Sequence, residues 1–304
     1  MKPVIFATES YKYLLEEICS EDSFEPGAIV RDTFTDGERY YRVETDVSHR
    51  KVVLIGGSIS DTDTLELYDM ASSLVDHGAS SLHMFIPYFG YSTMERAVKR
   101  GEIVTAKNRA RLFSSIPRSH RGNHIYLFDL HTEGLPYYFE NGIQAHHIYC
   151  KSLIIKACQD ALGHNFVLAS TDAGRAKWVE SLANDMGVAA AFVLKRRAGK
   201  DQTEVSAINA DVKGKNIIIY DDMIRSGSSI VSAARAYKNA GADNILVVTS
   251  HGLFVGNGLE KLRNSNLIQR VICTNTHANV KGIKNPFLEV RSIAPLLVEQ
   301  LQKI

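Results

Sequence analysis

The chain has 304 residues, of which 45% are hydrophobic and 23% are charged. This composition is typical of a folded globular protein and excludes disordered, collagen-like and coiled-coil chains, while the length suits two domains of about 150 residues each. Thirty-five basic residues against 34 acidic ones give a net charge of +1. Charge therefore gives no reason to expect nucleic acid or an anionic membrane as a partner, although a local basic pocket for a phosphorylated small molecule stays open.

Short β-rich runs alternate with amphipathic helical stretches along the chain. Most of the runs are continuously apolar, as in strands that are buried on both faces of a parallel sheet. In chain order, the sequence predicts strand 52–55, helix 61–77, strand 82–86, helix 105–116, strand 125–128, helix 151–162, strand 166–169, helix 173–186, strand 217–220, helix 229–240, strand 245–248, strand 287–290 and helix 294–303. Repeated strand–helix–strand units predict an α/β fold with mostly parallel sheets flanked by helices.

No low-complexity linker separates domains, and the weakest point for a boundary is around residues 142–149. We expect an N-terminal domain at 1–145, a C-terminal domain at 146–285, and a strand and helix at 286–304 that could pack on either domain, the N-terminal one included.

The four cysteines form no C-x-x-C pair, so we expect reduced thiols at Cys19, Cys150, Cys158 and Cys273. The apolar runs are far shorter than the roughly 18 residues of a membrane span, and the apolar stretch near the N-terminus is too short for a secretory signal. These features predict a cytoplasmic protein without a membrane partner.

The most informative segment is KNIIIYDDMIRSGSSIVSAARAYKNA at residues 215–240. An apolar strand ends in Asp221 and Asp222, and a turn formed by Arg225, Ser226, Gly227, Ser228 and Ser229 leads into a helix. Exposed carboxylates at the carboxyl end of a strand can accept hydrogen bonds from the vicinal hydroxyls of a ribose. The turn offers backbone N–H groups, hydroxyls and a helix N-terminus to a phosphate. The segment thus favours a sugar phosphate; the alternative is an ordinary strand-to-helix turn with Asp and Ser as capping residues.

This segment resembles the phosphoribosyl diphosphate binding motif of type I phosphoribosyltransferases, and five further motifs narrow the resemblance to the ribose-phosphate pyrophosphokinases. They are Phe34-Thr35-Asp36-Gly37-Glu38, Pro87 to Tyr91 with Thr-Ala-Lys at 105–107, Asp129-Leu130-His131 with Tyr138-Phe139, Ser170-Thr171-Asp172-Ala173-Gly174, and Lys195-Arg196-Arg197. The order and spacing fit from about residue 6 to residue 275.

The resemblance implies two phosphoribosyltransferase-type domains with the active site between them, and an enzyme that moves the β,γ-diphosphoryl group of Mg²⁺-bound ATP to the C1 hydroxyl of ribose 5-phosphate. It implies that AMP leaves and that the product is PRPP, a precursor in nucleotide and NAD biosynthesis. It further implies a homo-oligomer, a dimer or a hexamer, because a neighbouring subunit donates the loop that carries Phe34.

The resemblance also implies roles for individual residues. In the ATP site, Phe34 would stack on adenine, Asp36 and Glu38 would read its polar edge, and Arg96 would lie near the phosphates. His131 and Asp172 would hold Mg²⁺ directly or through water. Asp221 and Asp222 would hold the ribose hydroxyls, and Ser226–Ser229 the 5-phosphoryl group. Lys195 and Arg197 would lie on a mobile loop and stabilise charge on the transferred group.

Each role has a simpler alternative. Phe34 could be a core aromatic residue, and His131 could be a buried histidine with its hydrogen bonds satisfied. The basic run from Lys195 to Arg197 could be a solvated surface. It directly follows the apolar strand VAAAFVL and precedes a polar, glycine-containing stretch, an arrangement that also suits a lid over phosphates.

The sequence departs from the family pattern in its binding motifs. Thr93 and Met94 stand where the family has Arg and Gln near ATP. Arg225 stands where it has an acid, and Ser228 where it has a small residue. An arginine beside the sugar-phosphate turn favours a more extended anion, so ADP-ribose, giving ADP-ribose pyrophosphate in NAD salvage, is an alternative acceptor.

Two other classes stay open. A phosphoribosyltransferase proper would condense the diphosphate product with a base, and the motifs at Phe34–Glu38 and Lys195–Arg197 argue against it. A catalytically silent regulatory homologue would lack a working site, whereas this chain keeps His131 and Asp172 together with the basic and acidic pairs.

Overall fold

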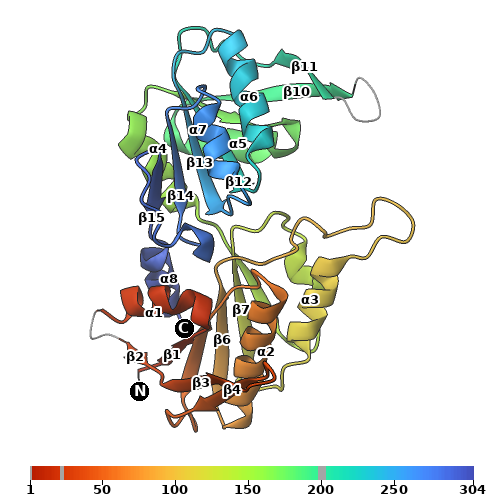
Figure 1. The fold of residues 1–304 in the computed structure, drawn as a ribbon, viewed down its shortest axis with the longest axis vertical. Coiled ribbons are helices and arrows are strands. Elements are labelled where there is room, and N and C mark those ends of the chain that lie inside the picture. Colours follow the sequence, from red (N-terminus) through yellow and green to blue (C-terminus); the bar gives the residue numbers. More distant parts are fainter. Residues whose placement is uncertain (1, 21–23, 198–202) are drawn as a thin grey trace. The chain divides into compact units, whose positions relative to one another are not determined.

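The computed structural model describes residues 2–20, 24–197 and 203–304, without the side chains of residues 194–207. The chain forms two compact units, one of Met1–Tyr149 with Ala294–Ile304 and one of Cys150–Ile293. Each unit is a sheet flanked by helices (Figure 1), which confirms the predicted α/β class with mostly parallel sheets. None of the described helices is long and apolar enough to cross a membrane.

The sheet of the first unit has six parallel strands in the order β2-β1-β5-β6-β7-β8. The four inner strands are almost completely buried, as expected when helices cover both faces of a parallel sheet, whereas the edge strands β2 and β8 are partly exposed. The strands are β1 (Val4–Ala7), β2 (Glu25–Pro26), β5 (Lys51–Ile55), β6 (Ser81–Ile86), β7 (Asn123–Phe128) and β8 (Gln144–Ile148).

Among the described residues of this unit, the helices are α1 (Lys12–Ile18), α2 (Asp61–Asp76), α3 (Thr105–Ser114) and α8 (Ala294–Leu301), together with the 3₁₀ turns η1 (Glu9–Tyr11) and η2 (Leu135–Tyr138). The Ser60 hydroxyl caps α2 by accepting a hydrogen bond from the Asp63 N–H at 3.1 Å. Side chains of α2 and α3 pack on one face of the sheet, while α1 contacts β1 and α8.

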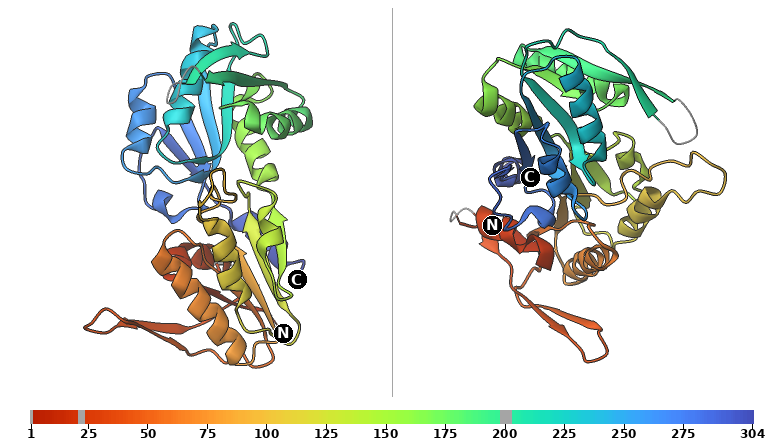
Figure 2. Two further views of the ribbon diagram at one scale, coloured as in Figure 1. Left: turned by 90° about the vertical axis from the view of Figure 1, so that its right-hand side faces the viewer. Right: turned by 45° about the horizontal axis from the view of Figure 1, so that its top comes forward.

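A separate antiparallel hairpin, β3 (Ile29–Thr33) and β4 (Arg39–Val43), projects from the first unit (Figure 2). Its turn is closed by hydrogen bonds from the Phe34 N–H to the Glu38 carbonyl and from the Gly37 N–H to the Phe34 carbonyl, at 2.8 and 2.9 Å. Gly37 has φ +94°, which glycine adopts without the steric cost of a Cβ. The pattern of the sequence does not indicate this hairpin.

The sheet of the second unit has seven strands in the order β11-β10-β9-β12-β13-β14-β15, all parallel except the β10–β11 pair. They are β9 (Val167–Ser170), β10 (Ala189–Arg197), β11 (Thr203–Ile208), β12 (Ile217–Ile224), β13 (Ile245–Gly252), β14 (Arg270–Thr274) and β15 (Leu288–Arg291). The helices are α4 (Lys151–Leu162), α5 (Ala176–Met186), α6 (Ser228–Asn239) and α7 (Gly258–Asn264), with 3₁₀ turns η3 (Ala173–Arg175) and η4 (Ala278–Val280).

The predicted helices and strands are confirmed to within a few residues, including the last two. In the tail, β15 completes the sheet of the second unit, whereas α8 belongs to the first. The prediction that a strand ends before Lys195 is wrong, because β10 continues to Arg197 and pairs there with β11. All four cysteines are free thiols, as predicted, and burial raises the pKa of both Cys158 and Cys273 to about 12.

Candidate functional site

The two acids of the central segment lie inside β12, where that strand runs on beyond its neighbour. The pairing of β9 with β12 stops at Ser170 and Tyr220, while β12 stays paired with β13 up to Ile224. Asp221 and Asp222 therefore lie beside the open end of β9. Ligands of parallel α/β sheets bind at this carboxyl edge.

Arg175 fills the space that opens beside these acids. It ends η3, the turn that follows β9, and its Nη2 lies 2.7 Å from the Asp222 Oδ2. Its Nε lies 3.8 Å from the Asp221 Oδ1. The Asp222 side chain is only 3% exposed, so the expectation that both carboxylates are exposed is wrong for Asp222. The burial of this charge is offset by the arginine.

Asp221 keeps more contact with solvent, with 17% of its side chain exposed. Its Oδ2 accepts a hydrogen bond from the Thr171 hydroxyl at 3.2 Å, and its Oδ1 accepts one from the Asp222 N–H at 3.0 Å. Burial, and next the neighbouring Asp222 charge, raise the pKa of Asp221, while Arg175 and Thr171 act in the opposite direction. Of the two acids, Asp221 therefore has the more exposed carboxylate.

Asp172 lies at the same edge, directly after β9. Its Oδ1 accepts a hydrogen bond from the Gly174 N–H at 2.9 Å and so caps η3. The Ser170 hydroxyl donates to the Asp172 carbonyl at 2.6 Å. The structure thus brings Asp172 and the β12 acids together on neighbouring strand ends, each in a fixed backbone setting.

The turn from Arg225 to Ser229 follows β12 and opens α6. Gly227 has φ +73° and precedes the first residue of α6, and the hydroxyls of Ser226 and Ser228 lie 3.2 Å apart. Arg225, Ser226, Ser228 and Ser229 are all exposed. The free N–H groups at the start of a helix, together with these hydroxyls, make a cradle that suits a phosphate.

Residues at and just before the start of α7 contact this turn. The Val255 N–H donates to the Arg225 carbonyl at 2.9 Å. A Cβ added to Gly258 would meet that same carbonyl oxygen at 2.6 Å, so only glycine allows this close approach. Lys261 of α7 extends its Nζ to within 2.6 Å of the Ser228 hydroxyl, which adds a positive charge to the turn.

Sequence reasoning missed Thr171, Arg175 and Lys261. Thr171 lies within the motif at residues 170–174, and Arg175 directly follows that motif. Their positions in the sequence could therefore have indicated them as site residues. Lys261 is 33 residues from Ser228, and nothing in the local pattern connects the two.

In the first unit, Phe34 lies in the turn of the β3–β4 hairpin with 57% of its surface exposed. This excludes the alternative that it is a core residue. Its ring meets Tyr40 edge-on at a centroid distance of 6.0 Å. The Asp36 carboxylate accepts from the Glu38 N–H at 3.0 Å, so the three residues of the predicted adenine site share one short turn.

His131 follows β7 and is half-buried. The turn before it is sharp, since Asp129 has φ +44°, and it is held by a hydrogen bond from the Leu130 N–H to the His147 Nε2 at 2.9 Å. Accepting at Nε2 requires a neutral imidazole. Burial lowers the pKa of His147, in agreement with this role.

The remaining predicted residues have fewer described contacts. Arg96 is exposed, and its Nε lies 3.4 Å from the side-chain carboxylate of Glu95. The backbone carbonyl of Glu95 accepts a hydrogen bond from the Tyr138 hydroxyl. The backbones of Lys195 and Arg197 belong to β10, but their side chains lie outside the described residues. His131 belongs to the first unit and Asp172 to the second, and no group of three or more potential metal ligands occurs among the described residues.

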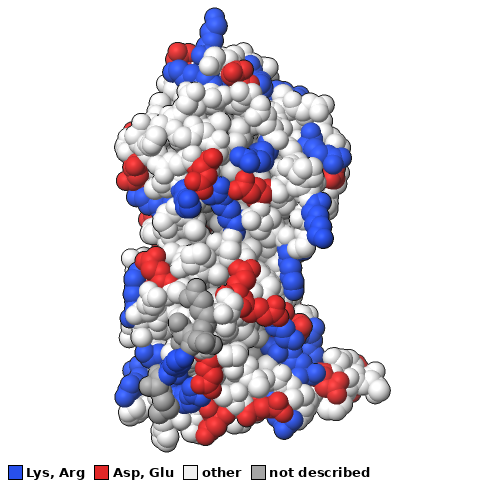
Figure 3. All heavy atoms as spheres, turned by 90° about the vertical axis from the view of Figure 1, so that its left-hand side faces the viewer, with Lys and Arg blue, Asp and Glu red and all other residues white. Residues whose placement is uncertain are grey.

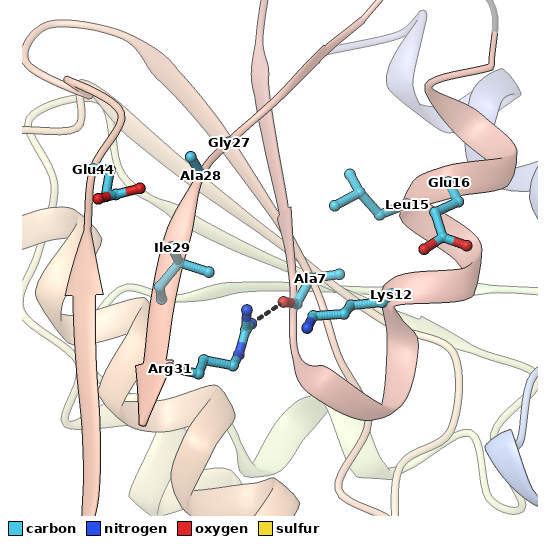
Figure 4. Close-up of a pocket in the computed structure, with 9 residues that line it drawn as sticks. All are labelled: Ala7, Lys12, Leu15, Glu16, Gly27, Ala28, Ile29, Arg31 and Glu44. Atoms are coloured by element: carbon cyan, nitrogen blue, oxygen red, sulfur yellow. Dashed lines mark hydrogen bonds between the residues drawn. The ribbon is translucent and has the colours of Figure 1, made fainter. Parts of the chain in front are cut away.

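A cavity of about 290 Å³ lies where α1, the end of β1 and the hairpin meet (Figure 4). Arg31 donates to the Ala7 carbonyl there, and its Nε lies 3.0 Å from the buried Glu66 carboxylate. These contacts tie the base of the hairpin to the body of the unit.

On the face drawn in Figure 3, basic side chains are interspersed with acidic ones, as the near-neutral composition leads one to expect.

Two family models match the chain. The N-terminal domain of ribose phosphate pyrophosphokinase matches residues 3–116, and the phosphoribosyl synthetase-associated domain matches residues 169–304. A ribose-phosphate pyrophosphokinase of Prochlorococcus marinus is 31% identical over 96% of this chain and 87% of its own length. One of Caldanaerobacter subterraneus is 30% identical over 99% of this chain and 94% of its own length.

The fold has a close counterpart among solved structures. The phosphoribosylpyrophosphate synthetase of Mycobacterium smegmatis superposes with a TM-score of 0.88 over 99% of this chain and 98% of its own, at 24% sequence identity.

Proposed function

Because this chain belongs to the ribose-phosphate pyrophosphokinases, a family of transferase enzymes, we propose that it transfers the β,γ-diphosphoryl group of ATP to ribose 5-phosphate. The observation that carries the proposal is the phosphate turn beside Asp221 at the carboxyl edge of the second sheet. The C1 oxygen attacks the β-phosphorus, the bond from that phosphorus to the oxygen of the α-phosphate breaks, and AMP leaves.

The acceptor binds through the second unit. The turn at Ser226–Ser229 holds the 5-phosphate with backbone N–H groups and hydroxyls. The Asp221 carboxylate accepts hydrogen bonds from the ribose hydroxyls, and each such charge-assisted bond is worth about 1.5–3 kcal/mol. Asp222, paired with Arg175, acts through Asp221: it fixes the strand end and adds negative charge there.

ATP binds through residues of the first unit. Phe34 stacks on the adenine, Asp36 and Glu38 accept from its amino group, and Arg96 and His131 lie toward the phosphates. An exposed aromatic ring on a projecting hairpin is suited to meet a nucleotide held by another copy of the chain, so we propose a homo-oligomer, a dimer or a hexamer.

Mg²⁺ is the proposed metal, which Asp172 and His131 would hold directly or through water. Magnesium is bound in such sites by one or two carboxylates plus the phosphates of the substrate. The half-buried Asp172 carboxylate, with one oxygen engaged by the Gly174 N–H, fits this requirement. When bound, the metal neutralises charge on the polyphosphate of ATP.

Catalysis on this view is positioning plus electrostatic stabilisation, as in phosphoryl transfer generally. Lys195 and Arg197 stabilise the charge that develops on the transferred group. No side chain forms a covalent intermediate.

ADP-ribose is a second candidate acceptor. It is favoured by the exposed Arg225 and by Lys261, which together make the phosphate turn more basic than its serines alone. A bidentate arginine suits a second phosphate beyond the first.

The test is mass analysis of the products after incubation with ATP, Mg²⁺ and either acceptor. AMP and PRPP are expected with ribose 5-phosphate. A preference for ADP-ribose that Arg225→Asp weakens selectively would establish the second acceptor instead. AMP release from neither acceptor would contradict the proposal and favour a regulatory homologue, and turnover of PRPP with a base would favour a phosphoribosyltransferase.

A further inference from the structure

A groove runs along α6 beside the phosphate turn, on the side of the helix away from the sheet. It is a hollow of about 510 Å³, and its polar lining consists of Ser228, Ser232, Arg235, Asn239 and Lys261. Residues 228, 232, 235 and 239 are spaced at three and four along the helix, so they form one continuous face. Val231 and Ala236 supply a small apolar floor.

The charge of this groove is entirely positive among its described lining residues. Arg235 and Lys261 contribute two cations, and no carboxylate lines the hollow. Arg235 is exposed and forms no ion pair with a described side chain. Two hydroxyls and an amide complete the lining, so every polar group there can donate a hydrogen bond.

Neighbouring cations on the same two helices are engaged elsewhere. Arg263 of α7 pairs with the Glu260 carboxylate at 3.0 Å, and Lys238 of α6 donates to the Asp243 carbonyl. Arg263 and Lys238 are not among the described residues that line the groove, so they supply matched controls on the same two helices.

The groove and the phosphate turn share Ser228. This residue begins α6, lies 3.2 Å from the Ser226 hydroxyl on the side of the turn, and accepts from Lys261 on the side of the groove. A ligand whose first phosphate occupies the turn can therefore place its next anionic group at Lys261 without leaving the surface of α6.

The size of the groove exceeds what one phosphate needs. Sites for small organic ligands fall at about 300–1,000 Å³. The α6 groove lies within that range, has an apolar floor for a flat or aliphatic group, and extends over about three turns of the helix. Its cations sit at the end nearest the turn and in the middle.

We propose that the α6 groove binds a phosphoryl group of a ligand, next to the phosphate that occupies the turn. The phosphoryl group has two sources. It can be the second phosphate of an extended acceptor such as ADP-ribose, a case that rests on the proposed function, or it can belong to a separate phosphate-bearing ligand.

The test is calorimetric titration of the whole chain without ATP, so that no turnover is required. The ligands are ADP-ribose, ribose 5-phosphate and inorganic phosphate, and the variants are Arg235→Ala and Lys261→Ala. The controls are Arg263→Ala and Lys238→Ala, which remove cations of the same helices outside the groove.

If the acceptor supplies the group, each groove variant weakens ADP-ribose binding about tenfold, the change expected for one lost charge-assisted contact. Arg235→Ala then leaves the affinity for ribose 5-phosphate within about twofold, and the controls leave both affinities unchanged. If a separate ligand supplies it, the wild-type chain binds inorganic phosphate at two sites and the groove variants at one, and Arg235→Ala leaves the affinities for both acceptors unchanged.

Unchanged binding of all three ligands in both groove variants would overturn the proposal. So would equal losses in the control variants, since the effect would then be one of general charge. Because binding is measured without chemistry, a chain that binds ADP-ribose in the groove but releases AMP with neither acceptor would contradict the proposed function and leave the groove assignment standing.

Discussion

The guanidinium of Arg175 and the carboxylate of Asp222 meet at 2.7 Å on the inner side of the strand end, which makes the two neighbouring aspartates of β12 unequal. Asp222 is paired with Arg175 and almost fully buried, whereas Asp221 is more exposed and has its pKa raised by burial and by the charge of Asp222. Arg175 is thereby a positioning residue for the predicted ribose site.

Replacing Arg175 with Ala should raise the pKa of Asp221 further, because the arginine favours the ionised carboxylate. The ribose hydroxyls need that carboxylate as an acceptor, so affinity is lost as the pH falls through the raised pKa, about 7 in the native chain. We expect the acidic limb of the pH profile for ribose 5-phosphate binding to move to higher pH in Arg175→Ala. A profile superimposable on that of the wild-type protein would show that the arginine has no electrostatic role.

Asp221→Asn and Asp222→Asn should separate binding from stability. Asp222→Asn leaves the largely buried Arg175 without its main partner and should cost about 3–5 kcal/mol of unfolding free energy. Asp221→Asn removes one of two adjacent buried charges, so stability at pH 8 should be retained or increased while acceptor binding weakens. Denaturant unfolding and calorimetric titration of both variants give the comparison; equal destabilisation by the two would refute the distinction.

Lys195→Ala and Arg197→Ala should each lower kcat by roughly 10²-fold with little change in the KM for ATP. A group that meets charge only in the transition state acts on rate rather than on ground-state binding. Arg196→Ala, a neighbouring basic residue without an assigned role, is the control. Near-normal turnover in both variants would mean that the run is a solvated surface.

Phe34→Ala should raise the KM for ATP about tenfold or more, since stacking a base on an aromatic ring is worth about 1–3 kcal/mol. The exposed position of the ring predicts an unchanged melting temperature. Phe34→Tyr should restore the affinity, and Tyr137→Ala, another exposed aromatic of the first unit, should have no effect. Loss of stability with normal ATP affinity would assign Phe34 a structural role instead.

Three histidine rings stack across β6, β7 and β8: His83 on His124 at a centroid distance of 4.7 Å, and His124 on His146 at 5.7 Å. Burial lowers the pKa of His83 to about 3 and lowers those of the other two. A lowered pKa means that the unfolded chain binds protons first as the pH falls below about 6.5, so stability decreases from there downward.

His83→Gln should reduce this slope, by up to about 1.4 kcal/mol per pH unit for the one proton removed. Unfolding free energies of wild type and variant between pH 7.5 and 5 provide the measurement. Comparing the two cancels the contribution of the carboxylates, and parallel curves would contradict the assignment.

The alternation of apolar runs and amphipathic stretches was sufficient to predict the fold class, because strands such as 52–55 and 217–220 are buried on both faces. The β3–β4 hairpin escaped prediction because none of its strand residues is buried, so no periodic core pattern identifies them. Its turn was still recognised, through the motif at Phe34–Glu38.

The site was predicted only as far as its motifs reach. Asp172, Asp221 and the serine turn came from short contiguous patterns that the fold brings to one sheet edge. The pairing of Arg175 with Asp222, and of Lys261 with Ser228, depends on which strand outruns its neighbour and on how α7 packs under the turn. Those are properties of tertiary structure that local sequence does not encode.

The assignment of α8 to the first unit has a consequence for biosynthesis. The ribosome completes Tyr149 and must add 145 further residues before Ala294 emerges, which takes roughly 7–30 s at about 5–20 residues per second. During that interval α1 lacks the helix that covers it, and the second unit has time to fold first. The first unit is therefore the last to complete its folding. A chaperone that acts on the nascent chain would meet the apolar surface of α1 that α8 later covers.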